Sequence, residues 1–212
     1  MARHKSGHPA LRKLTAEFYA RPAEKLAEEL IGKILVRKWR ADDGKTVEHR
    51  ARIIETEAYV GEHDLACHAA KGRTARTEIM FGPAGFAYVY FIYGMYDMLN
   101  IVSGKVGDAE AVLIRGAVPV DGSTLDLSGP GKLTRAMHIT RRDNGADLTG
   151  DDLFIVDDGA AKPVIVRTPR IGVDYAKQWK DEPLRFIDAD FHRVRGSVPR
   201  FDISAQFGKV PP

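Results

Sequence analysis

Residues 55–59, which read Glu-Thr-Glu-Ala-Tyr, hold the side chains best suited to acid–base chemistry in this chain. Alternate side chains of a β-strand point to one face, so we expect the carboxylates of Glu55 and Glu57 to lie together. Two like charges on one face repel each other unless something uses them, and a glutamate in a partly apolar pocket can act as a general base on water. The alternative is a pair of solvated glutamates on an exposed strand.

A second group is aromatic: residues 86–96 include Phe86 and Phe91 together with four tyrosines, at positions 88, 90, 93 and 96. Aromatic faces can grip an extruded base, and a side chain on a turn can wedge into the vacancy left in a duplex. The same run is also typical of a buried core strand. We favour the wedge because Tyr93-Gly94-Met95 predicts an exposed turn.

Basic residues flank the aromatic run in the sequence, and phosphates would be their natural partners. For each of them the alternative is an ordinary solvated surface, so charge alone assigns no individual role. These residues are Lys71, Arg73, Arg76, Lys132, Arg135, Arg141 and Arg142.

The elements that must position these groups can be predicted from hydrophobic spacing. Residues 15–35 have apolar side chains at helical spacing, which predicts one or two helices broken near Pro22. Residues 33–39 and 52–59 read as two strands of a hairpin, with its turn at residues 42–44.

The rest of the chain adds mainly strands. Residues 85–93 and 109–118 predict buried strands, and residues 128–137 predict a turn and a helix start whose amino end is a candidate anion site. Antiparallel strands mixed with flanking helices indicate an α+β (mixed α/β) fold rather than an alternating βαβ series. Later strands are expected at residues 153–156, 164–167 and 184–187.

The length and composition bound the domain count and the class of protein. A chain of 212 residues can bury one sizeable core, so we expect a flexible basic tail over residues 1–12 and a single domain over residues 13–205. With 44% hydrophobic and 29% charged residues, the chain is not disordered in bulk. The net charge of +3 permits a nucleic-acid partner without requiring one.

The single cysteine, Cys67, excludes an internal disulfide and a cysteine-rich zinc site, which favours a reducing compartment. No apolar stretch long enough for a signal peptide or a membrane span follows the basic amino terminus. We therefore expect a cytoplasmic, nucleoid-associated protein without a membrane partner, and a monomer by default.

Several separated motifs, all in one order, resemble the alkyladenine (3-methyladenine) DNA glycosylase family. The resemblance extends from about residue 15 to residue 190. It is carried by residues 55–59, His68, and residues 80–83, 88–95, 100–101, 112–115, 129–133, 170–173 and 183–186.

This resemblance implies a single mixed α/β domain with an antiparallel sheet at its centre. It also implies a base-excision-repair enzyme that flips alkylated or deaminated purines out of double-stranded DNA. Hydrolysis of the N-glycosidic bond would leave an abasic site, with no metal or other cofactor.

The resemblance further assigns roles to single residues on the reaction side. Glu57 looks like the general base that activates the attacking water, and Arg115 with the main chain at Ile171 looks like the rest of the water's cradle. Tyr93 resembles the wedge that replaces the flipped nucleotide. The remaining DNA contacts are expected from Met95, Lys132, Arg73 and Arg76.

On the base side, Tyr59 and Tyr90 resemble the stacking walls of the pocket, and His68 closes one side near the purine edge. Asn100 resembles the side chain that disfavours guanine by crowding its exocyclic amine.

Three alternatives remain at this point. A bifunctional lyase would need an amine in the pocket, and no lysine is near Glu57 in the sequence, although Lys71 could approach in the fold. A non-catalytic nucleic-acid-binding module would stack bases without turnover. A metal-dependent nuclease would use hard-oxygen and imidazole ligands in a spacing that matches no known pattern, namely Glu55, Glu57, His63, Asp64 and His68.

Overall fold

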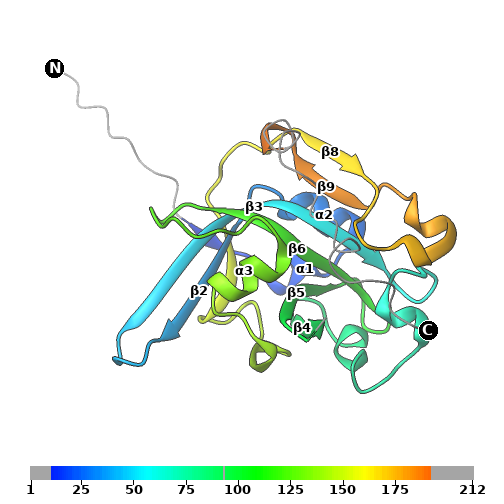
Figure 1. Ribbon diagram of the computed structural model, residues 1–212, viewed down its shortest axis with the longest axis horizontal. Helices are drawn as coiled ribbons and strands as arrows, with labels where there is room; N and C mark the ends of the chain where they lie inside the picture. The colour runs from blue at the N-terminus through cyan, green and yellow to red at the C-terminus, as the bar shows by residue number, and fades with distance from the viewer. Residues whose placement is uncertain (1–10, 93, 192–212) are drawn as a thin grey trace.

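The computed structural model describes residues 11–92 and 94–191, which form one large antiparallel sheet with a few short helices (Figure 1). The strand order is β1-β7-β2-β3-β6-β5-β4, with β9 also beside β3 and β8 beside β9. This arrangement is the expected α+β class, with far more strand than helix. The strands are β1 (Arg12–Lys13), β2 (Ile34–Arg40), β3 (Thr46–Val60), β4 (Ala87–Ile92), β5 (Tyr96–Ser103), β6 (Glu110–Pro119), β7 (Leu153–Asp157), β8 (Ile165–Thr168) and β9 (Arg185–Asp188).

The helical prediction for residues 15–35 is right about the break and too long at its end. Pro22 separates α1 (Ala16–Tyr19) from α2 (Ala23–Leu30), and strand β2 already begins at Ile34. Leu26, Ala27 and Leu30 of α2 are completely buried, which places this helix against the sheet. Burial of this apolar stripe stabilises so short a helix, because its own hydrogen bonds would not.

The third helix, α3 (Pro130–Ala136), begins as predicted after the turn at residues 128–129, and it packs over β5 and β6 (Figure 1). Its contact with β5 is close, since a Cβ at Gly131 would lie 2.5 Å from the Tyr96 ring. Four short 3₁₀ segments complete the helices of the described residues: His68–Lys71, Glu78–Phe81, Arg141–Asp143 and Asp174–Lys180.

The predicted hairpin of residues 33–59 is confirmed as β2 and β3, which are antiparallel around a turn at residues 42–44. The strands predicted at residues 85–93, 109–118, 153–156, 164–167 and 184–187 are confirmed as β4, β6, β7, β8 and β9. The prediction missed β5, because Asp97 and Asn100 are residue types that strands usually avoid. It is nevertheless a nearly fully buried strand between β4 and β6.

The pairing of β3 with β6 is irregular at one place. Ile53 faces Ala117 and Glu55 faces Gly116, but Thr56 then faces Ile114, so the register passes over Ile54 and Arg115. At the same point β9 takes over from β2 as the other neighbour of β3, since β2 pairs only as far as Arg52. Such bulges re-aim side chains and are frequent next to active sites.

The segment of residues 61–86 has no strand of its own and covers a second, smaller core beside the sheet. Its buried members include Cys67, Met80, Phe81 and Tyr88. Within the described ranges, no helix is long and apolar enough to cross a membrane. The predicted tail over residues 1–12 lies mostly outside the described residues, and Arg12 already belongs to β1.

Candidate active site

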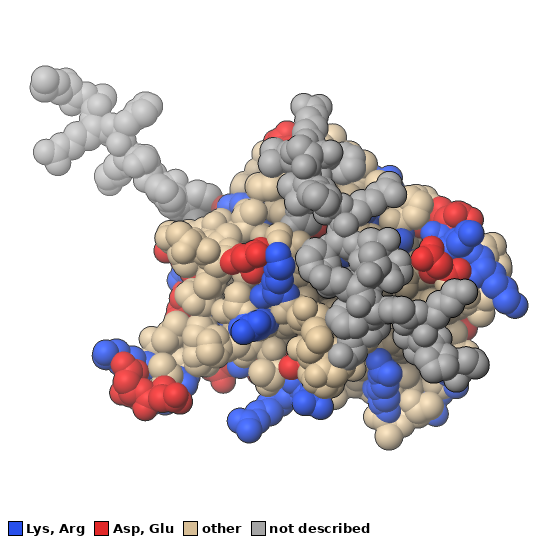
Figure 2. Space-filling model, in the orientation of Figure 1, with Lys and Arg blue, Asp and Glu red and all other residues tan. Residues whose placement is uncertain are grey.

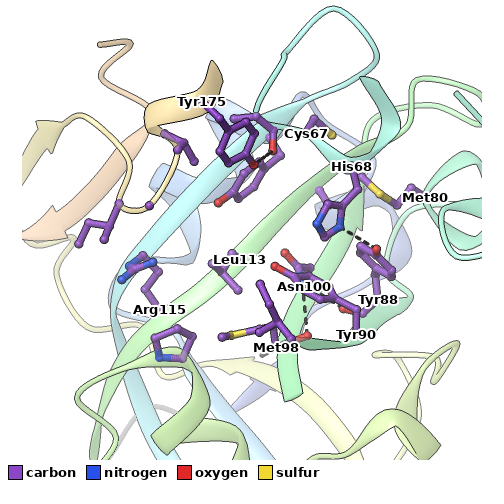
Figure 3. A pocket seen from close by; sticks show the side chains of 18 residues that line it. Cys67, His68, Met80, Tyr88, Tyr90, Met98, Asn100, Leu113, Arg115 and Tyr175 are labelled. Carbon is purple, nitrogen blue, oxygen red and sulfur yellow. Dashed lines mark hydrogen bonds between the residues drawn. The ribbon is translucent and has the colours of Figure 1, made fainter. Parts of the chain in front are cut away.

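A hollow of about 800 Å³, open to solvent, lies where β3 to β6 meet the segment 66–80 and the loop 171–175 (Figure 3). Six of the predicted site residues line it together: Tyr59, His68, Tyr90, Asn100, Arg115 and Ile171.

Glu57 lies beneath this hollow with 0% of its surface exposed. Its Oε1 accepts the main-chain N–H of Ile171 at 2.8 Å, and its Oε2 accepts the Tyr59 hydroxyl at 2.9 Å. Nη1 of Arg115 lies 3.4 Å from the same carboxylate. Two hydrogen-bond donors and a guanidinium thus surround the Glu57 side chain on three sides and fix its orientation.

Glu55 points to the same face as Glu57, as the strand spacing predicted. Its Oε1 accepts Nε of Arg115 at 3.1 Å and Nε of Arg185 at 2.7 Å. Thr56 between them points the other way, since its hydroxyl donates to the carbonyl of Ala27 in α2 at 2.9 Å. The repulsion expected between two adjacent carboxylates is therefore offset by two arginines.

Arg115 links the two carboxylates from its position at the bulge in β6. Burial disfavours its charge, but Glu57 and then Glu55 outweigh burial and raise the pKa of the guanidinium above its ordinary value. It is therefore cationic at neutral pH. The pocket thus has a permanent positive charge next to Glu57.

The walls of the hollow are aromatic rings. Tyr88 and Tyr90 lie 5.2 Å apart between ring centroids, and the His68 ring meets Tyr90 edge-on at 4.5 Å (Figure 3). Burial, and then the charge of Glu57, raises the pKa of Tyr59, while burial followed by Tyr88 raises that of Tyr90. Both therefore remain neutral phenols that can stack on a planar ligand.

His68 is held in one protonation state. Its Nδ1 lies 2.9 Å from the Tyr88 hydroxyl and its Nε2 lies 3.3 Å from Nη2 of Arg76. Because a guanidinium only donates, Nε2 accepts and Nδ1 carries the proton that it donates to Tyr88. Burial, followed by the charges of Arg76 and Lys71, lowers its pKa to about 4, so the ring is neutral at pH 7.

Asn100 lies in β5 on the same side of the pocket as Tyr90 and Met98 (Figure 3). It is only 3% exposed, and its Nδ2 donates to the carbonyls of Tyr88 at 3.2 Å and Met98 at 3.4 Å. These two bonds fix the orientation of the Asn100 side-chain amide, with Nδ2 toward the two carbonyls.

Sequence reasoning missed an ion pair between Asp64 and Arg170 behind the pocket. The pair is fully buried and holds the peptide that precedes Ile171. Asp64 had been considered only as a metal ligand, and Arg170 only as part of a motif. The one available signal was the position of Arg170 directly before Ile171.

The predicted DNA-contacting residues lie outside the hollow or at its edge. Arg76 lies over the Tyr90 ring at 5.0 Å, Arg73 pairs with Glu78 at 3.0 Å, and Lys132 pairs with Asp126 at 2.8 Å. Met95 is 50% exposed. Tyr93, the predicted wedge, lies outside the described residues.

On the face shown in Figure 2, the charge pattern does not by itself single out a DNA-binding patch. In the view of Figure 2, lysine and arginine side chains are interspersed with aspartate and glutamate. The predicted anion site at the start of residues 128–137 is the first turn of α3, where Gly129 provides no side-chain cap. Pro130 of this turn lines the hollow.

The candidate ligands of a metal-dependent nuclease do not assemble. In residues 11–92 and 94–191, no three His, Cys, Asp or Glu side chains are grouped as a metal site. Glu55, Glu57 and Asp64 each have an arginine partner instead.

Comparison with known proteins identifies a family of similar sequences. A family described as Methylpurine-DNA glycosylase (MPG) matches residues 17–192. Three relatives, each named "Putative 3-methyladenine DNA glycosylase", come from Legionella pneumophila (strain Lens), Anaeromyxobacter sp. (strain Fw109-5) and Methanocella arvoryzae. They are 48%, 50% and 48% identical, over 85%, 82% and 88% of this chain and 96%, 88% and 97% of their own lengths.

Proposed function

Because the chain belongs to the methylpurine-DNA glycosylase family, we propose that it flips alkylated or deaminated purines out of duplex DNA and hydrolyses their N-glycosidic bond. The product would be an abasic site in an otherwise intact strand. The observation that carries the proposal is Glu57, a buried carboxylate held by three donors directly beneath an aromatic pocket.

In the proposed reaction, a damaged purine leaves the stack and enters between Tyr59 and Tyr90, with His68 at its edge. Extrusion costs a few kcal/mol and is least costly for a damaged or mispaired base. An alkylated purine carries positive charge, and a cation on a tyrosine face gains about 0.5–2 kcal/mol. The neutral rings of both tyrosines support this selection for cationic bases.

The chemical step needs one activated water. Glu57 takes a proton from this water, whose oxygen forms a bond to C1′ of the sugar while the bond from C1′ to the purine nitrogen breaks. The bonding electron pair leaves with the purine: a cationic purine becomes neutral, whereas a neutral one such as hypoxanthine leaves as an anion that takes a proton from solvent water. Glu57 then returns its proton to solvent. Throughout this step, Arg115 and the N–H of Ile171 orient the Glu57 carboxylate toward the water. Asn100 acts on selectivity instead, because it disfavours guanine by crowding its amino group.

Hydrolysis without strand cleavage is the reaction of a monofunctional glycosylase. A lyase would need an amine nucleophile, and among the described residues none that lines the hollow is a lysine. Lys71, the nearest lysine by sequence, does not line it. Borohydride should therefore trap no protein on damaged DNA, and a trapped adduct would contradict this assignment.

The remaining parts of the proposal concern the DNA and the cell. Tyr93 would fill the vacancy in the duplex, Met95 would contact the bases beside it, and Arg73, Arg76 and Lys132 would bind phosphates. We further propose one domain over residues 13–205 that acts as a monomer in the cytoplasm, close to the nucleoid.

The test is a single-turnover incubation with a duplex that carries one ethenoadenine, one hypoxanthine or one 3-methyladenine, in EDTA. Alkali then reveals abasic sites. Glu57→Gln is compared with Glu48→Gln, a carboxylate on the same strand that pairs with Lys38 and Arg50 away from the hollow. Cleavage by wild type and Glu48→Gln but not by Glu57→Gln supports the proposal, whereas tight binding without product from any substrate would favour a binding module.

A further inference from the structure

The ion pair between Asp64 and Arg170 is the most deeply buried one among the described residues. Both side chains have 0% of their surface exposed. The two terminal nitrogens of Arg170 each donate to a different carboxylate oxygen of Asp64, at 2.8 Å for Nη2 and Oδ1. Such a two-pronged pair fixes distance and orientation together.

Arg170 also binds two main-chain carbonyls. Nη1 donates to Ala58 of β3 at 2.8 Å and Nη2 donates to Trp179 at 3.3 Å. The guanidinium lies over the Tyr59 ring at 4.8 Å from its centroid. One side chain therefore ties the end of β3, with its proposed stacking wall, to the segment of residues 170–179.

Asp64 organises the loop that leaves β3. Its Oδ2 accepts the N–H of Val60 at 3.2 Å and its Oδ1 accepts the N–H of Ala66 at 2.9 Å. This loop leads directly into His68. Each oxygen of the carboxylate therefore accepts one bond from the Arg170 guanidinium and one from a main-chain N–H of this loop.

Ile171, the residue after Arg170, contacts Glu57, the proposed general base. The N–H of Ile171 donates to Oε1 of Glu57 at 2.8 Å, so the position of the Arg170 main chain determines this bond. Gly172 follows with a φ of +77°, a conformation that turns the chain sharply after Ile171. The ion pair and the turn together place one N–H on one carboxylate oxygen.

Stability alone does not account for this pair. Removing two charges from water costs several kcal/mol, and apolar residues of similar volume often serve equally well or better. A buried ion pair is better explained by a need to fix the positions of the groups around it. Here the geometry is that of Glu57 and the Tyr59 ring.

We propose that Asp64 and Arg170 are positioning residues of the reaction, which hold the Ile171 N–H on Glu57 and the Tyr59 ring at the pocket wall. In this role neither side chain touches the flipped purine or the attacking water. This inference rests on the proposed role of Glu57.

The test uses Arg170→Lys and Asp64→Asn, with Arg52→Lys as the matched control. Arg52 makes the same kind of contacts elsewhere, to the carbonyl of Gly32 at 2.6 Å and to Asp158 at 2.7 Å. Asp64→Asn keeps the size of the side chain, so it serves if Arg170→Lys does not fold. Thermal denaturation establishes the folded fraction of each protein.

Two readouts distinguish positioning from mere structural support. In the amide NMR spectrum, the Ile171 proton should move upfield in Arg170→Lys and Asp64→Asn, in the direction also expected for Glu57→Gln, because its bond to a carboxylate is weakened. In single turnover with saturating enzyme, the rate of base release should fall by roughly 10- to 100-fold. The enzyme concentration at half saturation should change less than about threefold, since no phosphate contact is lost.

An unchanged Ile171 resonance, or a rate loss equal to that of Arg52→Lys, overturns the proposal. So does a rate that falls only in proportion to the unfolded fraction. These outcomes differ from failure of the proposed function, in which the wild-type protein itself releases no base from any damaged duplex.

Discussion

Two regions of the site differ in how their side chains are held. The floor is made of Glu55, Glu57, Arg115, Asp64 and Arg170. All are buried except Arg115, whose side chain is 12% exposed, and every charge among them has a charged partner at 3.4 Å or less. The rim, defined by Arg73, Arg76, Met95 and Lys132, is much more open. The side chains of Arg73 and Lys132 are 58% and 46% exposed and pair with neighbours only five and six residues away in sequence.

The contrast between floor and rim indicates which side chains of the site are preorganised. Exposed ion pairs contribute about 0–1 kcal/mol and exchange partners easily, so rim residues can leave Glu78 or Asp126 for a phosphate. Buried pairs lose several kcal/mol if one partner is removed. In the proposed function, the floor would therefore be ready for chemistry before DNA arrives, whereas the rim would adjust to the duplex that it binds.

The largest difference between floor and rim should come from Glu57. Glu57→Gln removes the proton acceptor while keeping the shape, and we expect single-turnover base release to fall by about 10³-fold or more. Lys132→Gln should lower it by less than about fivefold under saturating enzyme. Similar losses in the two variants would mean that the floor is not where the chemistry happens.

The next largest effect concerns stability. Arg115→Gln leaves Glu55 and Glu57 facing each other without their shared cation, so the free energy of unfolding should fall by about 3–5 kcal/mol in urea denaturation. Adding Glu55→Gln should restore part of the loss, because one of the two repelling charges is gone. Arg73→Gln on the rim should change it by less than about 1 kcal/mol. Strict additivity of the two floor substitutions would argue against their coupling.

A pH effect should follow from His68, which lies between the two regions. Its pKa is lowered from 6.5 to about 4, so the unfolded chain takes up a proton before the folded protein does as the pH falls. The free energy of unfolding should accordingly decrease below pH 6.5 and stop responding to this group below about 4, by at most about 3 kcal/mol. In His68→Gln this part of the pH dependence should disappear. Parallel curves for the two proteins between pH 7 and 4.5 would contradict it.

The smallest effects belong to single rim residues. Arg73→Gln and Lys132→Gln should each weaken binding of a damaged duplex about two- to fivefold. Each should reduce the slope of log Kd against log salt concentration by at most about 0.9. Lys162→Gln, which breaks an exposed pair with Glu28 outside the hollow, is the control. An unaltered salt slope in all three variants would remove Arg73 and Lys132 from the DNA interface.

The floor was partly predictable because strand alternation is a local rule. Positions 55 and 57 share a face in any regular strand, and the structure keeps them together. What could not be predicted were partners that only the fold brings close. Asp64 and Arg170 are separated by 106 residues, and Arg115 reaches Glu55 from 60 residues away.

Strand β5 was missed for a related reason. Asp97 and Asn100 lower the strand propensity of their segment, yet Asn100 is satisfied by the carbonyls of Tyr88 and Met98, and the Asp97 carbonyl accepts the Thr134 hydroxyl of α3 at 2.7 Å. Tertiary contacts of this kind override local preference. The aromatic run before β5 was identified correctly as a strand, although its pocket-facing side could only be seen in the fold.

The irregular pairing of β3 and β6 has a consequence for how such chains can change length. Ile53 faces Ala117 before it and Thr56 faces Ile114 after it, three residues further along in both strands. Each strand has one residue without a partner here, Ile54 in β3 and Arg115 in β6, so the pairing register is the same before and after the irregularity. A single deletion at Ile54 would slip the rest of β3 by one position and turn Glu57 toward α2. Insertions and deletions here should therefore be tolerated only as matched pairs, one in each strand.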